Sequence, residues 1–180
     1  MLAPLTLANE EPTRLREFEA RLAHLEPIFA ELEHEFVSGD TIADDAADAL
    51  EEAAFLAGVM EATQAAKSLP AALLELAALA AERSSAYRHF LGLAPAMHRG
   101  APRDAIETFL ATGDVIARTE HATDAKEREV TFALLAADPP DARMMVLAGG
   151  IAHHLEAAVD ALLHASLVLR DHVLGNILFA

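Results

Sequence analysis

The chain has 180 residues, of which 29 are acidic and 13 are Lys or Arg, so its formal net charge is −16. Nucleic-acid-binding proteins need clustered basic residues to neutralise phosphates, and this charge therefore argues against that class. The chain contains no cysteine, which excludes disulfide bonds and thiolate metal sites. Cations or a basic protein surface are the expected partners.

The composition predicts an all-α fold. Hydrophobic residues make up 53% of the chain but aromatic residues only 5%. Alanine and leucine, which favour helices, supply much of the apolar content, and runs of β-branched residues are nearly absent. A chain of this length can form one substantial core or two small helical bundles.

Five helices are expected, and long helices with short connections predict an antiparallel bundle. Pro95, Gly100 and Pro102 break the chain near its middle, where helix-breaking residues are concentrated. We expect an N-terminal helical half at 1–98 and a C-terminal helical hairpin at 99–180, packed together as one domain. The expected helices cover about 12–37, 42–67, 70–93, 103–137 and 141–177.

The amino terminus, MLAPLTLANEEP, lacks the basic region and the apolar core of a signal peptide. No stretch of about 18 residues is both free of charge and apolar enough to suggest a membrane span. A soluble cytoplasmic protein is therefore expected.

Two pairs of carboxylates lie in the last two expected helices, Glu120 with Asp124 and Glu156 with Asp160. Residues four apart share one face of a helix, so each pair points two acids in the same direction. Each pair also interrupts a stripe of apolar or small residues, where core positions are expected. Burial of clustered carboxylates is costly unless a cation or protons neutralise them. If the two helices pack side by side, four carboxylates meet at a candidate metal site.

Surface charge is the alternative interpretation, because most acids on helices are solvated. A third pair, Asp44 and Asp48, has the same spacing. It stands near the start of a helix, where acidic side chains commonly complement the helix dipole. We favour the dipole interpretation for this pair and keep it as a weaker candidate for metal binding.

Histidines extend the candidate ligand set. His153 precedes Glu156 by three residues on the same face, and His164 follows Asp160 by one turn. Each of them could instead be satisfied by a neighbouring carboxylate. Carboxylates suit magnesium, manganese and iron, and imidazole also suits zinc. The expected cofactor is therefore a divalent or ferric ion: iron, zinc, manganese or magnesium.

The residues do not favour an enzyme. No arrangement of nucleophile, base and acid stands out. Glu31 and His34 form a single Glu-x-x-His, whereas a ferritin-like di-iron site needs two. Gly149 and Gly150 lack the spacing and the preceding strand of a phosphate loop, and close approach of helices explains them more simply.

Four stretches, taken in order, resemble the PhoU-like proteins, specifically the branch of phosphate transport regulators accessory to Pit-type phosphate transporters. The resemblance covers the chain from about residue 40 to its end. The stretches are DDAADALEEAAFLAG at 44–58, SLPAALLELAALAAE at 68–82, RTEHATDAKEREVTFALL at 118–135 and HHLEAAVDALLHASLVLRDHVLGNIL at 153–178.

The resemblance implies two related helical bundles whose Glu/Asp-x-x-x-Asp motifs bind metal ions, in some members as multinuclear iron or zinc clusters. It implies regulation of phosphate uptake through contact with a transporter or its regulatory protein, without catalysis. A homo-oligomer is also expected, peripheral to the membrane at most through its partner.

The four acids of the last two helices match the motif of the second bundle, and Asp44 with Asp48 matches half of the motif of the first. No such motif precedes residue 40, so a reduced N-terminal bundle is expected.

Two other functions stay open at this point. A carboxylate-bridged metalloenzyme on a helical bundle would need an open coordination position beside a pocket. A metal-free helical adaptor would instead turn its acid pairs towards solvent or a basic partner.

Overall fold

The structure is a computed structural model that describes residues 41–63, 69–118, 120–137 and 141–179. All regular secondary structure in these residues is helical, which confirms an all-α fold for this part of the chain. The helix expected at 12–37 lies outside the described residues. The helices are α2 (Thr41–Ala62), α3 (Ala71–Leu93), α4 (Arg103–Arg118), α5 (Glu120–Leu135) and α6 (Ala142–Phe179), and a 3-10 turn (Ala94–Ala96) follows α3.

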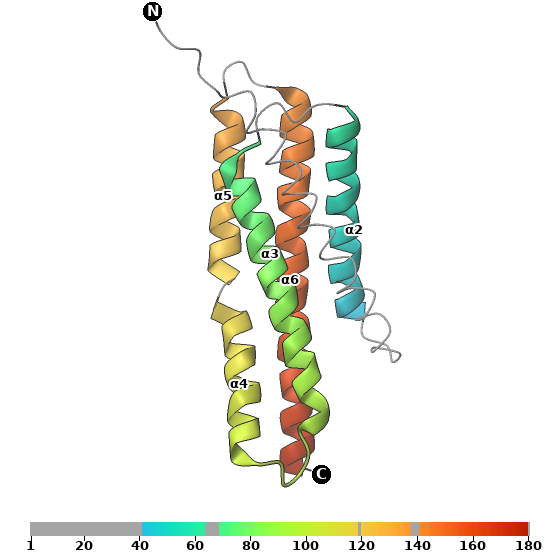
Figure 1. Ribbon diagram of the computed structural model, residues 1–180, viewed down its shortest axis with the longest axis vertical. Helices are drawn as coiled ribbons and strands as arrows, with labels where there is room; N and C mark the ends of the chain where they lie inside the picture. The colour runs from blue at the N-terminus through green and yellow to red at the C-terminus, as the bar shows by residue number, and fades with distance from the viewer. Residues whose placement is uncertain (1–40, 64–68, 119, 138–140, 180) are drawn as a thin grey trace, which may run out of the picture.

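The helices form an antiparallel bundle around α6 (Figure 1). Helices α2, α4 and α5 run in one direction, and α3 and α6 run in the other. The 38 residues of α6 span about 57 Å at 1.5 Å per residue, and α6 contacts α2, α3, α4 and α5. Helix α5 lies beside one half of α6 and α4 beside the other half. Helix α3, in the first half of the sequence, contacts α4, α5 and α6, which are in the second half.

Local sequence explains several helix boundaries. Gly100 has a φ of 93°, a left-handed conformation that favours glycine, in the turn between α3 and α4. The carboxylate of Asp141 caps α6, because its Oδ1 accepts hydrogen bonds from the backbone N–H groups of Arg143 and Met144 at 2.9 and 3.3 Å. Pro70 stands immediately before α3 and contributes the carbonyl that accepts from the N–H of Leu73.

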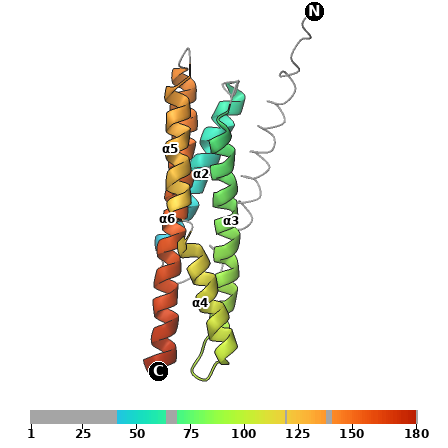
Figure 2. The same ribbon diagram turned by 90° about the vertical axis from the view of Figure 1, so that its left-hand side faces the viewer.

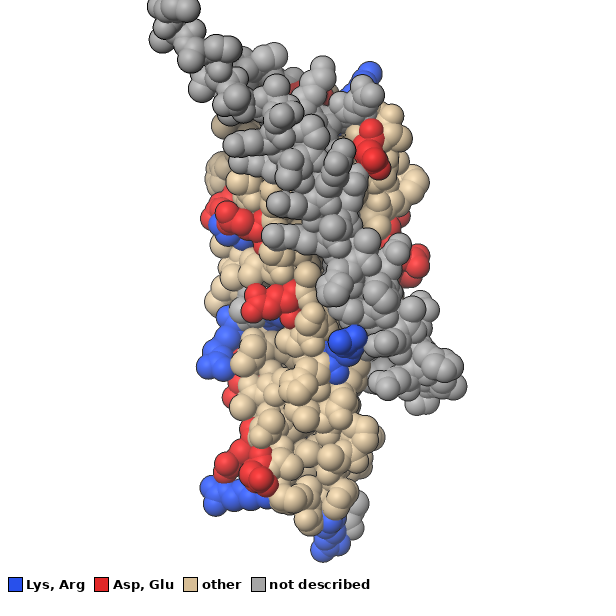
Figure 3. Space-filling model, in the orientation of Figure 1, with Lys and Arg blue, Asp and Glu red and all other residues tan. Residues whose placement is uncertain are grey.

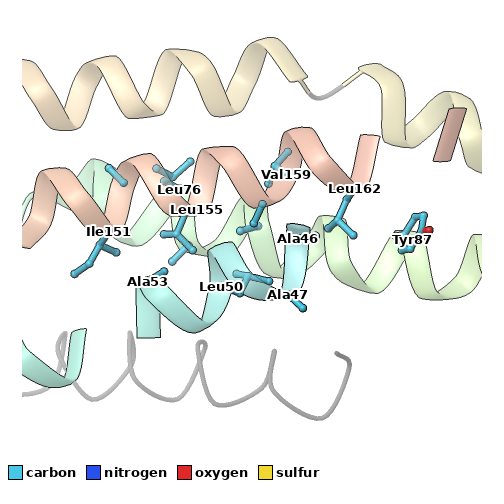
Figure 4. Close-up of a cluster of buried hydrophobic side chains, with 14 of the residues drawn as sticks. Ala46, Ala47, Leu50, Ala53, Leu76, Tyr87, Ile151, Leu155, Val159 and Leu162 are labelled. Carbon is cyan, nitrogen blue, oxygen red and sulfur yellow. The ribbon is translucent and has the colours of Figure 1, made fainter. Parts of the chain in front are cut away.

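Small residues dominate the interface between α2 and α6. Figure 4 shows side chains of α2 directed at those of α6. On α2 the buried residues include Ala46, Ala53 and Ala57. A Cβ atom at Gly150 of α6 would lie 2.8 Å from Cδ1 of Leu56, so the end of the Leu56 side chain would have to shift to admit it. This glycine therefore lies where α2 and α6 are in contact.

In the range where one helix was expected, 103–137, the structure describes α4, which ends at Arg118, and α5, which begins at Glu120; residue 119 lies outside the described residues. Both helices contact α3 and α6. Phe109 of α4 stacks on Phe90 of α3 with ring centroids 4.3 Å apart. Figure 2 shows α4 leaning towards α3 while α5 follows α6.

The apolar stripes expected to be buried, with Leu135 in the first and Met145 in the second, are each displaced by one residue from the face that is buried. Leu135 is 62% exposed and Met145 is 36% exposed, whereas the preceding Leu134 and Met144 are buried. Because α6 is apolar on most sides, its periodicity could not fix which face is buried. The candidate acids consequently lie at the edge of the α5–α6 interface and not in its centre.

Helix α6 is the one helix in the described residues that is long and apolar enough to cross a membrane, judged by length and composition. The expectation concerned stretches free of charge, and α6 contains charged residues such as Glu156 and Asp160. Buried core helices can have the same length and composition. Ile151, Leu155 and Leu162 of α6 are buried among the other helices, although only 39% of its apolar stretch is buried.

Candidate metal centre

Five side chains at the α5–α6 interface form two overlapping groups. Potential ligand atoms of Asp124, Glu156 and Asp160 lie within 4.8 Å of one another, and those of Glu127, His153 and Glu156 do the same. Glu156 belongs to both groups. The structure therefore brings together four acids and one histidine from two helices.

The helical spacing explains this convergence. Asp124 and Glu127 are three residues apart on α5, and His153, Glu156 and Asp160 follow one another at intervals of three and four on α6. Such intervals place side chains on one face of a helix. Because α5 and α6 are antiparallel, each acid of α5 meets a different turn of α6.

Basic residues neutralise this cluster only in part. Arg128 Nη2 lies 3.2 Å from Asp124 Oδ2 on the exposed side of α5. Lys126 points away from the cluster, because its Nζ lies 2.6 Å from Glu75 of α3 and 2.6 Å from Glu129. A surplus of negative charge therefore remains between α5 and α6.

Glu156 responds most strongly to this surplus. Burial, followed by the negative charges of Asp160, Glu127 and Asp124, raises the pKa of Glu156 to about 7 from an ordinary value of 4.5. Its carboxyl is accordingly about half protonated at neutral pH. A bound cation could take the place of this proton.

The site is accessible from solvent. The side chain of His153 is 66% exposed, and its Nδ1 lies 3.6 Å from Glu127 Oε1, whose side chain is 32% exposed. The side chain of Asp124 is 34% exposed. An ion could therefore reach these ligands without opening the core.

The remaining predicted ligands do not join the two groups. Asp44 and Asp48 are exposed on α2, and His164 is exposed on α6 one turn beyond Asp160. Glu120 is the first residue of α5, and the placement of its side chain lies outside what the structure describes. Asp44 lies in the first turn of α2, in agreement with the dipole interpretation, and neither Asp44 nor Asp48 joins a potential ligand group in the described residues.

Sequence reasoning missed Glu127. Its flanking residues, Lys126 and Arg128, make this part of the sequence resemble an ordinary solvated run of charges. The available signal was its spacing of three residues from Asp124, which allows both side chains to face α6.

The donor atoms of the two groups suit different ions. The group of Asp124, Glu156 and Asp160 offers only oxygen ligands, as magnesium, manganese and ferric iron prefer. The group of Glu127, His153 and Glu156 adds an imidazole nitrogen, which favours zinc or ferrous iron.

Comparison with protein-family models finds no match to the chain. Comparisons with curated proteins and with solved structures find none either.

Proposed function

We propose that this protein binds metal ions between α5 and α6 and acts as a metal-dependent accessory regulator of phosphate transport. The observation that carries the metal-binding part is the convergence of Asp124, Glu127, His153, Glu156 and Asp160. The raised pKa of Glu156 supports it, because without metal the neighbouring acids favour a proton on this carboxyl. A bound cation would neutralise the carboxylates in place of that proton.

Two adjacent subsites are part of this proposal, with Glu156 as the ligand that they share. A carboxylate has two oxygens and can bridge two cations. The subsite with His153 would take zinc or iron, and the subsite with Asp160 would take an ion that prefers oxygen ligands.

The role of the metal is partly structural. Metal binding would offset the repulsion between carboxylates of α5 and α6 and would hold the two helices together. Because the ligands lie at an exposed edge, binding would be reversible and could respond to the supply of metal.

The regulatory part of the proposal rests on the resemblance of residues 44–58, 68–82, 118–135 and 153–178 to the PhoU-like branch. On this basis the protein is cytoplasmic and homo-oligomeric, and it contacts a phosphate transporter or its regulatory protein without catalysing a reaction. Phosphate uptake by proteoliposomes containing a Pit-type transporter, with and without the metal-loaded protein, tests this part. Unchanged uptake, together with no binding to the transporter, would contradict it.

The metal-binding part is tested by thermal unfolding of metal-stripped protein in the presence of iron, zinc, manganese or magnesium, with bound metal counted by elemental analysis. Wild-type protein should gain stability with at least one ion at a defined stoichiometry. The double variant Glu156→Gln/Asp160→Asn should be more stable than wild type without metal, because it relieves charge repulsion. It should also lose the stabilisation by metal.

The matched control is Glu82→Gln/Asp114→Asn, which removes two exposed acids from α3 and α4. This variant should retain the full response to metal. An unchanged response in the Glu156/Asp160 variant, or equal losses in both variants, would reject the site. His153→Ala separates the subsites, because it should weaken zinc binding by at least about tenfold and leave magnesium binding nearly unchanged.

A carboxylate-bridged metalloenzyme is the second candidate. The observation that favours it is the exposed edge of the site, where each group of three ligands would leave coordination positions for water or substrate. Hydrolysis of a phosphoester by the metal-loaded protein, or oxidase activity with iron, would favour this candidate over the regulator.

A further inference from the structure

The outer face of α2 carries an exposed aromatic side chain beside a run of acids. Phe55 is 62% exposed although the opposite face of α2, with Ala46, Leu50 and Ala53, is buried against the core. Packing therefore fixes which side of α2 points outward. Figure 3 shows acidic side chains along the edge of the molecule formed by α2.

The exposed residues of this face follow a helical line. Asp44, Asp48, Glu51 and Phe55 are separated by four, three and four residues, and Ala62 continues the line two turns beyond Phe55. Residues 53–60 contain no charged side chain, and a Cβ atom at Gly58, which lies beside Phe55, would meet nothing within 4 Å. The outer face of α2 thus carries most of its acids in its first half, and its second half exposes Phe55, Gly58 and Ala62 beside one further acid, Glu61.

In the described part of the chain, no basic residue forms an ion pair with the acids on this face. Helix α2 contains six acids and no Lys, Arg or His. Acids in the first turn complement the helix dipole, but this effect fades beyond that turn and does not explain Asp48 or Glu51. Like charges three and four residues apart also weaken the helix.

We infer that the outer face of α2 is a docking surface for a basic amphipathic helix of a partner protein. The apolar side of that helix would cover Phe55 and the shallow surface at Gly58 and Ala62. Its Lys and Arg residues would pair with Asp44, Asp48 and Glu51. Charge complementarity selects this occupant, since α2 would repel an anionic lipid surface or a nucleic acid.

This surface is separate from the metal centre. Helices α2 and α5 lie on opposite sides of α6 (Figure 1), and the metal ligands come from α5 and α6. Binding at α2 can therefore be measured in the presence of a chelator. Its outcome does not depend on the proposed metal site.

The test uses a synthetic helical peptide of about 18 residues that contains only leucine and lysine, with leucines on one face. Such a helix is about 27 Å long, close to the length of the exposed face. Fluorescence anisotropy of the labelled peptide measures its Kd for the full chain. Phe55→Ala should weaken binding by about tenfold, as expected for an aromatic anchor. Phe132→Ala, which truncates a side chain that is 72% exposed on α5, should leave the Kd unchanged.

The electrostatic contribution needs its own control, because a cationic peptide is attracted to any acidic protein. The variant Asp44→Asn/Asp48→Asn/Glu51→Gln should weaken binding by about tenfold. The control variant Asp104→Asn/Glu107→Gln/Asp114→Asn removes the same charge from exposed positions of α4 and should change binding less than about twofold. Circular dichroism confirms that each variant is folded.

The absence of cysteine permits a direct test of location. A fluorophore on Ala62→Cys should respond to the peptide, whereas one on Ala125→Cys of α5 should not. Equal weakening by the two charge variants, no effect of Phe55→Ala, equal responses of the two fluorophores or no binding at low salt would each overturn the inference.

Discussion

At the scale of single residues, Glu156 connects the electrostatics of the protein to its stability. It is the shared member of both ligand groups, and three neighbouring carboxylates oppose its ionisation. The sequence indicated Glu156, Asp124, Asp160 and His153 as candidate ligands, and the structure brings these four side chains together. It did not indicate Glu127, because spacing alone cannot show whether an acid between two basic residues faces a neighbouring helix or solvent.

Glu156 should make the apo protein less stable as pH rises. Its carboxyl binds a proton up to about pH 7 in the folded state but only up to about pH 4.5 when unfolded. The folded state therefore holds more protons between these values, and its stability falls as pH increases through this window. Glu156→Gln cannot lose a proton and should be more stable than wild type at pH 8 but not at pH 4.

Urea unfolding of both proteins at several pH values, with a chelator present, measures this difference. Glu82→Gln, at an exposed position of α3, serves as the control and should follow the wild-type pH profile. Parallel profiles for wild type and Glu156→Gln would show that Glu156 is ordinary surface charge.

At the scale of helices, two adjacent glycines of α6 face different neighbours. A Cβ atom at Gly149 would meet Cδ1 of Leu134 on α5 at 3.9 Å, an ordinary contact distance. A Cβ atom at Gly150 would meet Cδ1 of Leu56 on α2 at 2.8 Å, so Leu56 would have to move. A methyl group fits at Gly149 without any shift, and at Gly150 it requires the end of the Leu56 side chain to move.

Gly149→Ala should stabilise the protein by about 1 kcal/mol, the difference in helix propensity between the two residues. Gly150→Ala has the same gain in propensity but must displace Leu56, so it should be less stable than Gly149→Ala. Thermal and urea unfolding of the two variants in the same buffer make the comparison. A Gly150→Ala variant at least as stable as Gly149→Ala would mean that the α2–α6 interface is looser than described.

Helix positions were predicted more reliably than helix faces. The ranges of α3 and α6 agree with the expected 70–93 and 141–177 to within about two residues, whereas α2 ends at Ala62 and was expected to reach 67. The contact of Phe109 with Phe90 of α3 joins residues distant in sequence and was not predicted. The buried faces of α5 and α6 were misplaced because alanine-rich helices carry a weak periodic signal.

At the scale of the whole molecule, the net charge of −16 opposes folding through self-repulsion. Much of it lies on α2 and at the edge between α5 and α6. The composition gives this charge directly, and cations were expected as partners on that ground. The sequence did not predict that this negative charge is divided between two surfaces, because the division depends on which helices flank α6.

Salt should therefore stabilise the protein. Raising NaCl from about 0.1 to about 1 M shortens the Debye length from about 10 to about 3 Å and screens repulsion between surface acids. We expect the Tm to rise by several degrees, as about 1–2 kcal/mol would produce in a chain of this size. Thermal scans in NaCl and KCl measure the effect. The Tm of the variant lacking Asp44, Asp48 and Glu51 should rise less with salt than the Tm of wild type. An equal rise would mean that the repulsion arises between other acids.

The central position of α6 has a consequence for biosynthesis. Helices α2 to α5 leave the ribosome before the helix against which all of them pack. At about 5–20 residues per second, translating α6 takes about 2–8 s. During this interval the apolar faces of the earlier helices have no α6 to cover them. Nascent chains arrested before residue 142 should bind general chaperones, and chains that include α6 should be released from them.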